Sequence, residues 1–158
     1  MSQENVEIAR RFYPARVDLA AVFASPETLA ALRAEFEPLV DPDFETVPDP
    51  RYQMLLGDPD EVEGPSSLAV FHGLDGFTGT FAEWLSGWDS WMFSPVEFID
   101  VDESRVLVVA DISGRSKAQQ AEMTIRGGNL LTFGEGRLTR IELFLRQADA
   151  LKAAGLSE

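Results

Sequence analysis

The spacing between apolar residues changes once along this chain of 158 residues, and that change limits the folds open to it. In residues 1–40 and 67–91, apolar side chains recur every three or four positions, the repeat of an amphipathic helix. Between residues 95 and 146 they alternate with polar ones, as strands with one buried face do. Helices followed by strands favour an α+β fold. We therefore expect one α+β domain over residues 1–158, long enough to bury a core.

The first part of the chain predicts three helices. The first spans residues 3–13, and the second runs from the cap at Ser25 to Pro42. A Pro- and Asp-rich connection over 41–66 leads to a third helix at 75–89. The apolar stripe of this third helix is formed by Phe77, Phe81, Trp84 and Trp88.

The second part predicts a meander of four to six mostly antiparallel strands that curve over a core or cavity. Gly127 and Gly128 predict a bulge in the long strand near residues 120–133, and the glycines at 134 and 136 predict a hairpin turn. Leu138 and Phe144 are expected on the outer face of the sheet. Because exposed apolar side chains on a sheet tend to be covered, they predict a homodimer through that face.

Composition excludes several classes of function. The 27 acidic and 13 basic side chains give a net charge of −14, which argues against nucleic acid as a partner. The chain has no cysteine and one histidine, which excludes thiol chemistry and any site with two histidines. No apolar run is long enough for a membrane span or signal peptide, so we expect a cytoplasmic protein. The sequence implies no metal and no organic cofactor.

Four short segments, in order, resemble the SnoaL-like branch of the nuclear-transport-factor-2-like superfamily, whose fold is shared with ketosteroid isomerase and polyketide cyclases. The resemblance implies three helices packed on a strongly curved, mostly antiparallel sheet, which forms a cone with a pocket. It also implies that many members dimerise through the outer face of the sheet. The matching segments are ENVEIARRFY (4–13), LVDPDFE (39–45), FHGLDGF (71–77) and FGEGRLTRIE (133–142).

Only some of the catalytic residues of these relatives have a suitable counterpart in this chain. The ketosteroid isomerase tyrosine falls on Phe12, with Tyr13 beside it, and the protonated aspartate falls on Asn129. The isomerase base falls near Pro48, next to Asp49. The cyclase aspartate falls near Ala121 or Glu122, and its companion histidine near Arg115 or Ser116. Because a slip of one residue turns a strand side chain to the other face, the orientation of Glu122 stays open.

The resemblance predicts an apolar pocket for a hydrophobic small molecule, although its own side chains could instead fill it as a core. Two functions stay open. One is a general acid/base isomerase, cyclase or hydrolase for a hydrophobic carbonyl compound, with His72 or Asp49 moving the proton. The other is a non-catalytic small-molecule-binding or dimeric interaction module. The residues predicted to bind the molecule are Asn129, Phe12, Tyr13, Trp84, Trp88, Ile112, Leu131, Phe133 and Leu143.

Overall fold

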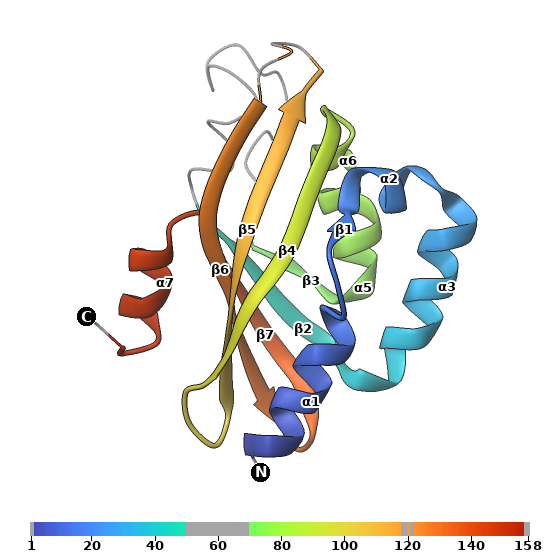
Figure 1. Cartoon of the computed structure of the whole chain (residues 1–158). Coiled ribbons are helices and arrows are strands. Elements are labelled where there is room, and N and C mark those ends of the chain that lie inside the picture. The colour runs from blue at the N-terminus through green and yellow to red at the C-terminus, as the bar shows by residue number, and fades with distance from the viewer. Residues whose placement is uncertain (1, 50–69, 118–119, 121, 157–158) are drawn as a thin grey trace.

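The computed structural model describes residues 2–49, 70–117, 120 and 122–156, and these residues form a curled sheet with helices on both faces (Figure 1). The sheet has seven strands in the order β1-β4-β5-β6-β7-β2-β3, one more than the upper limit of the prediction. All neighbours are antiparallel except β2 and β7. The strands are β1 (Val17–Asp18), β2 (Val40–Pro48), β3 (Phe71–His72), β4 (Trp88–Asp100), β5 (Arg105–Ser116), β6 (Glu122–Gly134) and β7 (Arg137–Phe144).

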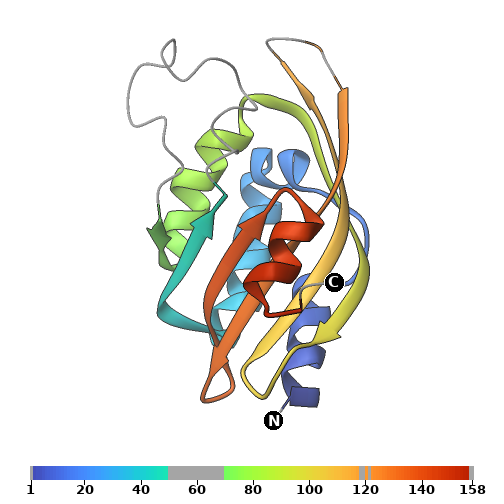
Figure 2. The ribbon, with the colours of Figure 1, turned by 90° about the vertical axis from the view of Figure 1, so that its left-hand side faces the viewer.

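The mostly antiparallel sheet with helices packed against it confirms the α+β class. Helices lie on both faces of this sheet. The concave face is covered by α1 (Ser2–Phe12), α2 (Leu19–Ala24), α3 (Pro26–Phe36), η1 (Glu37–Leu39), α5 (Gly73–Gly76), η2 (Phe77–Phe81) and α6 (Ala82–Leu85). The opposite face carries α7 (Gln147–Ala153), as the rotated view shows (Figure 2). No helix in the described part of the chain is long and apolar enough to cross a membrane.

Strand register separates an inner face from an outer one. Successive residues of a strand point to opposite faces. A row of residues paired across the strands therefore lies on one face of the sheet, and the next row lies on the other face. One row is buried on the concave side and consists of Val106, Leu131, Ile141, Thr46 and Phe71. The adjacent row is polar, faces outward, and consists of Arg105, Thr132, Arg140, Glu45 and His72.

The third predicted helix is wrong in its last part. The helical segments end at Leu85, and the chain continues as β4 from Trp88. Trp88 and Trp91 both face the core although they are three residues apart, because the pairing of β4 with β5 shifts between Trp88 and Ser90. This bulge in a strand therefore imitated the spacing of a helix.

The second predicted helix is also too long. It ends at Phe36, and Val40–Pro48 forms β2, where a Pro-rich connection was expected. Phe44 and Thr46 are buried at alternate positions of this strand. The remainder of the predicted connection, residues 50–66, lies outside the described residues.

The bulge predicted at Gly127 and Gly128 lies elsewhere. Pairing of β5 with β6 is continuous at both glycines. A Cβ atom on Gly127 would lie 2.4 Å from the Phe144 carbonyl oxygen, so the glycine provides room for the end of β7. The register shift instead falls between Thr132 and Phe133, and it turns Leu138 inward, with 1% of its surface exposed.

The outer face near Phe144 is covered by α7. Phe144 packs with Leu107, Val109, Leu130 and Ala150 in a second apolar cluster between the sheet and this helix. Leu138 was assigned to the outer face incorrectly, and Phe144 is partly buried within the chain itself. The predicted homodimer through this face stays a prediction.

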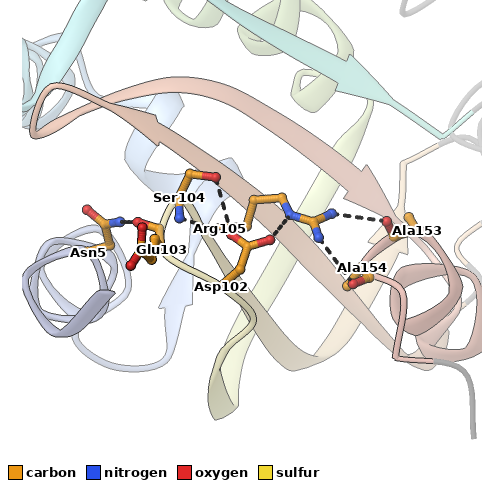
Figure 3. Close-up of polar contacts among 7 residues, drawn as sticks. All are labelled: Asn5, Asp102, Glu103, Ser104, Arg105, Ala153 and Ala154. Carbon is orange, nitrogen blue, oxygen red and sulfur yellow. Dashed lines mark hydrogen bonds and ion pairs between the residues drawn. The ribbon is translucent and has the colours of Figure 1, made fainter. Parts of the chain in front are cut away.

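The turn between β4 and β5 links the first and last helices (Figure 3). Asn5 in α1 donates from Nδ2 to the Glu103 carbonyl oxygen at 2.9 Å. Arg105 donates to the Asp102 carboxylate at 2.8 Å and to the carbonyl oxygens of Ala153 and Ala154, each at 3.4 Å. An arginine at the carbonyl end of a helix complements its dipole, so Arg105 helps to hold α7 against the sheet.

Asn5→Ala is expected to lower the free energy of unfolding by about 1 kcal/mol, because it leaves the Glu103 carbonyl without this donor. Asn5 is 4% exposed, so water replaces the lost hydrogen bond poorly. Urea denaturation measures the change. Gln3→Ala, at an exposed position of the same helix, is the matched control and should differ little from the wild type. Equal effects of the two substitutions would contradict the role assigned to Asn5.

Candidate functional site

An apolar cavity of about 170 Å³ lies between the concave face of the sheet and the helices that cover it. Its wall combines side chains from α1, α2, α3, α5 and η2 with side chains from five of the strands. The lining residues are Phe12, Tyr13, Val17, Leu19, Phe23, Leu29, Leu32, Arg33, Phe36, Val40, Phe44, Leu74, Phe77, Thr78, Phe81, Trp91, Phe93, Asn129, Leu138, Ile141 and Leu143.

Helix α3 forms one wall of the cavity. Four of its side chains line the cavity, yet none of its residues is buried. The Arg33 guanidinium donates to the Asp75 carboxylate at 2.6 Å and to the Thr78 hydroxyl at 3.1 Å, which fixes α3 to α5 and η2. Phe36 packs against Phe12 of α1, with ring centroids 4.7 Å apart. The apolar face of α3 therefore lines the cavity and is only half-buried.

Two polar side chains from distant parts of the sequence meet in the cavity wall. Asn129 donates from Nδ2 to the Tyr13 hydroxyl oxygen at 2.8 Å. Tyr13 follows α1 directly, and its ring stacks on Phe93 with centroids 4.9 Å apart. Asn129 is on β6 between Val108 and Leu143, on the concave face, and is 5% exposed.

Burial sets the ionisation of Tyr13. Removal from water disfavours the phenolate and raises the pKa of Tyr13 to about 12, while the hydrogen bond from Asn129 acts in the opposite direction. At neutral pH the side chain is therefore an uncharged phenol that can donate a hydrogen bond. The cavity thus combines a mostly apolar wall with one neutral polar pair.

Comparison with known proteins rests on structure alone, because no family model and no curated protein matches this chain. An NTF2-like protein from Burkholderia xenovorans LB400 is 19% identical and has a TM-score of 0.60, with 96% of this chain and 95% of that chain covered. A protein from Catenulispora acidiphila with a ketosteroid isomerase-like fold, in complex with trimethylamine, is 16% identical, with a TM-score of 0.55 and coverage of 87% and 88%. This protein has the NTF2-like fold. A candidate SnoaL-like polyketide cyclase from Jannaschia sp. CCS1 shares the fold at 14% identity and a TM-score of 0.54, with 80% and 79% covered.

The two predicted proton carriers lie outside the wall of the NTF2-like cavity. His72 is exposed on β3, opposite Glu45 of β2 on the outer face. Asp49 follows β2 and is 6% exposed, and its Oδ2 accepts a hydrogen bond from the Leu145 backbone at 3.2 Å. The structure does not bring either residue to the Tyr13–Asn129 pair, and their catalytic roles stay predictions.

The residues predicted to bind a molecule divide into two groups. Phe12, Tyr13, Asn129 and Leu143 line the cavity. The others belong to the packed core behind the wall and do not line the cavity; they are Trp84, Trp88, Ile112, Leu131 and Phe133. Glu122 is exposed beside Arg115, with its Oε1 3.4 Å from the guanidinium, while Met123 packs against the inner cluster. This register places Glu122 away from the cavity.

Several lining residues were missed as binding residues. Trp91 and Phe93 both face the concave side, and their alternation could have been detected if β4 had been recognised. Leu29, Leu32 and Phe36 recur at helical spacing within the second predicted helix, but such a stripe gives no indication of whether it faces a core or a cavity.

A second hollow lies on the surface next to the cavity. It is an open groove of about 540 Å³ between the end of α1 and the middle of β4. Tyr13 lines both the groove and the cavity. Arg10 lies in the groove with its guanidinium 4.6 Å from the centre of the Phe98 ring. Tyr13 is therefore the wall residue shared by the interior and this part of the surface.

Proposed function

We propose that this protein binds one small, mostly apolar molecule in the cavity of its NTF2-like fold. The observation that carries the proposal is α3, whose apolar face lines the cavity without any of its residues being buried. A helix packed into a filled core would bury this face. A cavity of about 170 Å³ is close in size to engineered apolar cavities of about 150 Å³ that accept benzene. The expected ligand therefore has the size of a single six-membered ring.

Toluene is a suitable first probe, because it tests the cavity without the polar pair. A ligand that binds only the folded state raises its stability, so the midpoint of thermal unfolding should increase with toluene concentration and saturate. Circular dichroism measures the midpoint. A saturating increase supports the proposal, whereas an unchanged midpoint up to the solubility limit of toluene contradicts it.

Leu32→Trp provides a direct control on the location. Leu32 lines the cavity, so a larger ring there should occupy the space and abolish the increase. Ala34→Trp introduces the same ring at an exposed position of the same helix and should leave the increase unchanged. If both variants still respond to toluene, the molecule binds elsewhere.

General acid/base chemistry on a hydrophobic carbonyl compound is the second candidate, favoured by the neutral Tyr13 hydroxyl as a donor to a developing oxyanion. It also needs a proton acceptor beside that pair. Among the described residues that line the cavity, none is Asp, Glu or His. Binding is therefore the function that the described residues support best. Exchange of the α-hydrogens of cyclohexanone in D₂O, followed by NMR, separates the two candidates: acceleration by the protein favours catalysis, and its absence favours binding.

A further inference from the structure

Helix α3 has the composition of a helix that forms readily from its own sequence. It consists mainly of Ala, Leu, Glu and Arg, which are strong helix formers. Its first turn carries Pro26, and the Ser25 hydroxyl accepts a hydrogen bond from the Thr28 backbone at 3.3 Å. None of its residues is buried, and it lies at the outer edge of the helical layer, away from the strands (Figure 1). The segment can therefore move as one helical unit.

The segments on either side of α3 are fixed to the sheet. Before α2, the Asp18 carboxylate accepts a hydrogen bond from the Trp91 backbone of β4 at 3.0 Å. After η1, Val40 is buried and pairs with Leu138 of β7. Between these anchors, the extended residue Ser25 alone separates α2 from α3, and η1 joins α3 to β2. Residues at the ends of helices commonly serve as hinges, so these two junctions are where α3 can turn.

The polar contact between α3 and the neighbouring helical wall depends on Arg33. Its guanidinium reaches Asp75 of α5 and Thr78 of η2, across the seam between the two walls. Arg33 and Thr78 both line the cavity, so this seam lies next to the interior. The ring contact of Phe36 with Phe12 lies at the other end of the argument's helix, in the last residue of α3 before η1. Loss of the Arg33 contacts therefore lets the two walls separate.

We infer that α3 is a lid over the cavity, hinged at Ser25 and η1, and that the Arg33–Asp75 ion pair is its latch. The inference rests on the proposed function, since it assigns the route by which a small apolar molecule reaches the cavity. Opening separates the apolar face of α3 from Leu74 and Phe77 on the neighbouring wall. Because an exposed ion pair is weak, the latch favours the closed state by only about twofold to fivefold. Burial of the half-buried apolar face provides the rest of the closing free energy.

The absence of cysteine from the chain allows a direct test with a single introduced thiol. Leu138 lines the cavity from β7 and is almost fully buried, so the thiol of Leu138→Cys should react with N-ethylmaleimide when the cavity opens. Asp75 does not line the cavity, and its side chain is 90% exposed, so Asp75→Ala breaks the latch without changing the wall. We expect this second substitution to raise the reaction rate of Leu138→Cys by about twofold to fivefold, measured by mass spectrometry.

Leu130→Cys is the matched control. Leu130 is equally buried, but it lies under α7 on the opposite face of the sheet and does not line the cavity. Asp75→Ala should leave the reaction rate of this thiol unchanged. Asp111→Ala is the control for the ion pair, because it removes a similarly exposed pair with Arg126 from the outer face of the sheet. It should leave the reaction rate of Leu138→Cys unchanged.

Toluene exchange tests the same lid without an introduced thiol, in case Leu138→Cys folds poorly. Line shapes in the NMR spectra of the labelled protein during a titration give the association and dissociation rates. A weaker latch speeds entry and exit alike, so both rates should rise by about twofold to fivefold in Asp75→Ala, while the dissociation constant stays the same. Asp111→Ala should leave both rates unchanged.

Three outcomes would overturn the inference. An unchanged rate for Leu138→Cys after Asp75→Ala means that the ion pair does not control access to the cavity. Equal increases in Leu138→Cys and Leu130→Cys mean that the whole fold has loosened. A rise in the toluene dissociation rate alone means that Asp75 stabilises the complex and is not a latch. If toluene does not bind the wild type, the proposed function fails, while the thiol rates still decide whether α3 opens.

Discussion

Trp91→Ala is expected to lower the free energy of unfolding by about 3–5 kcal/mol, the cost of removing a large aromatic side chain from a core. Trp91 is 1% exposed and contacts both other tryptophans, with ring centroids 4.9 Å from Trp84 and 4.7 Å from Trp88. Domains are stabilised by about 5–15 kcal/mol in total, so the loss is a large fraction of the stability. Urea denaturation with an unchanged m-value gives the difference directly.

The control for this substitution is Val96→Ala. Val96 is 49% exposed, and its truncation should change the free energy of unfolding by less than about 0.5 kcal/mol. Trp91 also forms part of the cavity wall, so its removal should enlarge the space and let a two-ring molecule such as naphthalene raise the unfolding midpoint of the variant but not of the wild type. A loss below about 1 kcal/mol in Trp91→Ala would mean that the aromatic cluster is not the centre of this core.

The strand faces could be predicted because alternation is a direct consequence of the pleat. On β7, Leu143 was placed in the wall of the pocket by the resemblance together with this alternation, and it lies on the concave face. The glycine hairpin was likewise correct, since Gly136 has a φ of +79° that favours glycine.

Errors arose where a bulge changes the phase of a strand. The shift near Trp88 made β4 resemble a helix, and the shift at Thr132 turned Leu138 inward, where strict alternation would place it outside. A bulge adds one residue to a strand, so a prediction that assumes strict alternation assigns the residues beyond the bulge to the wrong face. Helix α7 was missed because its seven residues present only a short apolar face to the outer side of the sheet.

Only part of the candidate site could be predicted, because the site also depends on contacts between elements that are far apart in the sequence. Asn129 stands out in an apolar strand, and its position followed from the resemblance to ketosteroid isomerase. Its contact with Tyr13 joins residues 116 positions apart, and it depends on where α1 ends relative to the sheet. Whether the apolar stripes of α3 and the third helix enclose a cavity depends on how far apart the elements lie, which spacing within one element does not determine.

Tyr13 should make the stability of the folded protein fall between about pH 10 and pH 12. Burial raises the pKa of Tyr13 from 10.0 to about 12 in the folded state, while the unfolded chain keeps the ordinary value. The folded state therefore holds the proton more tightly, and this contribution is fully present below pH 10 and is lost as the pH rises through 12. A shift of this size corresponds to about 2–3 kcal/mol.

The measurement is the free energy of unfolding of the wild type and of Tyr13→Phe at several pH values from 8 to 12.5. Other alkaline titrations are the same in both proteins and cancel in the difference. The wild type should lose about 2–3 kcal/mol relative to Tyr13→Phe across this range. Parallel pH profiles for the two proteins would show that the Tyr13 hydroxyl is in contact with water, and the polar end of the cavity would then be open to solvent.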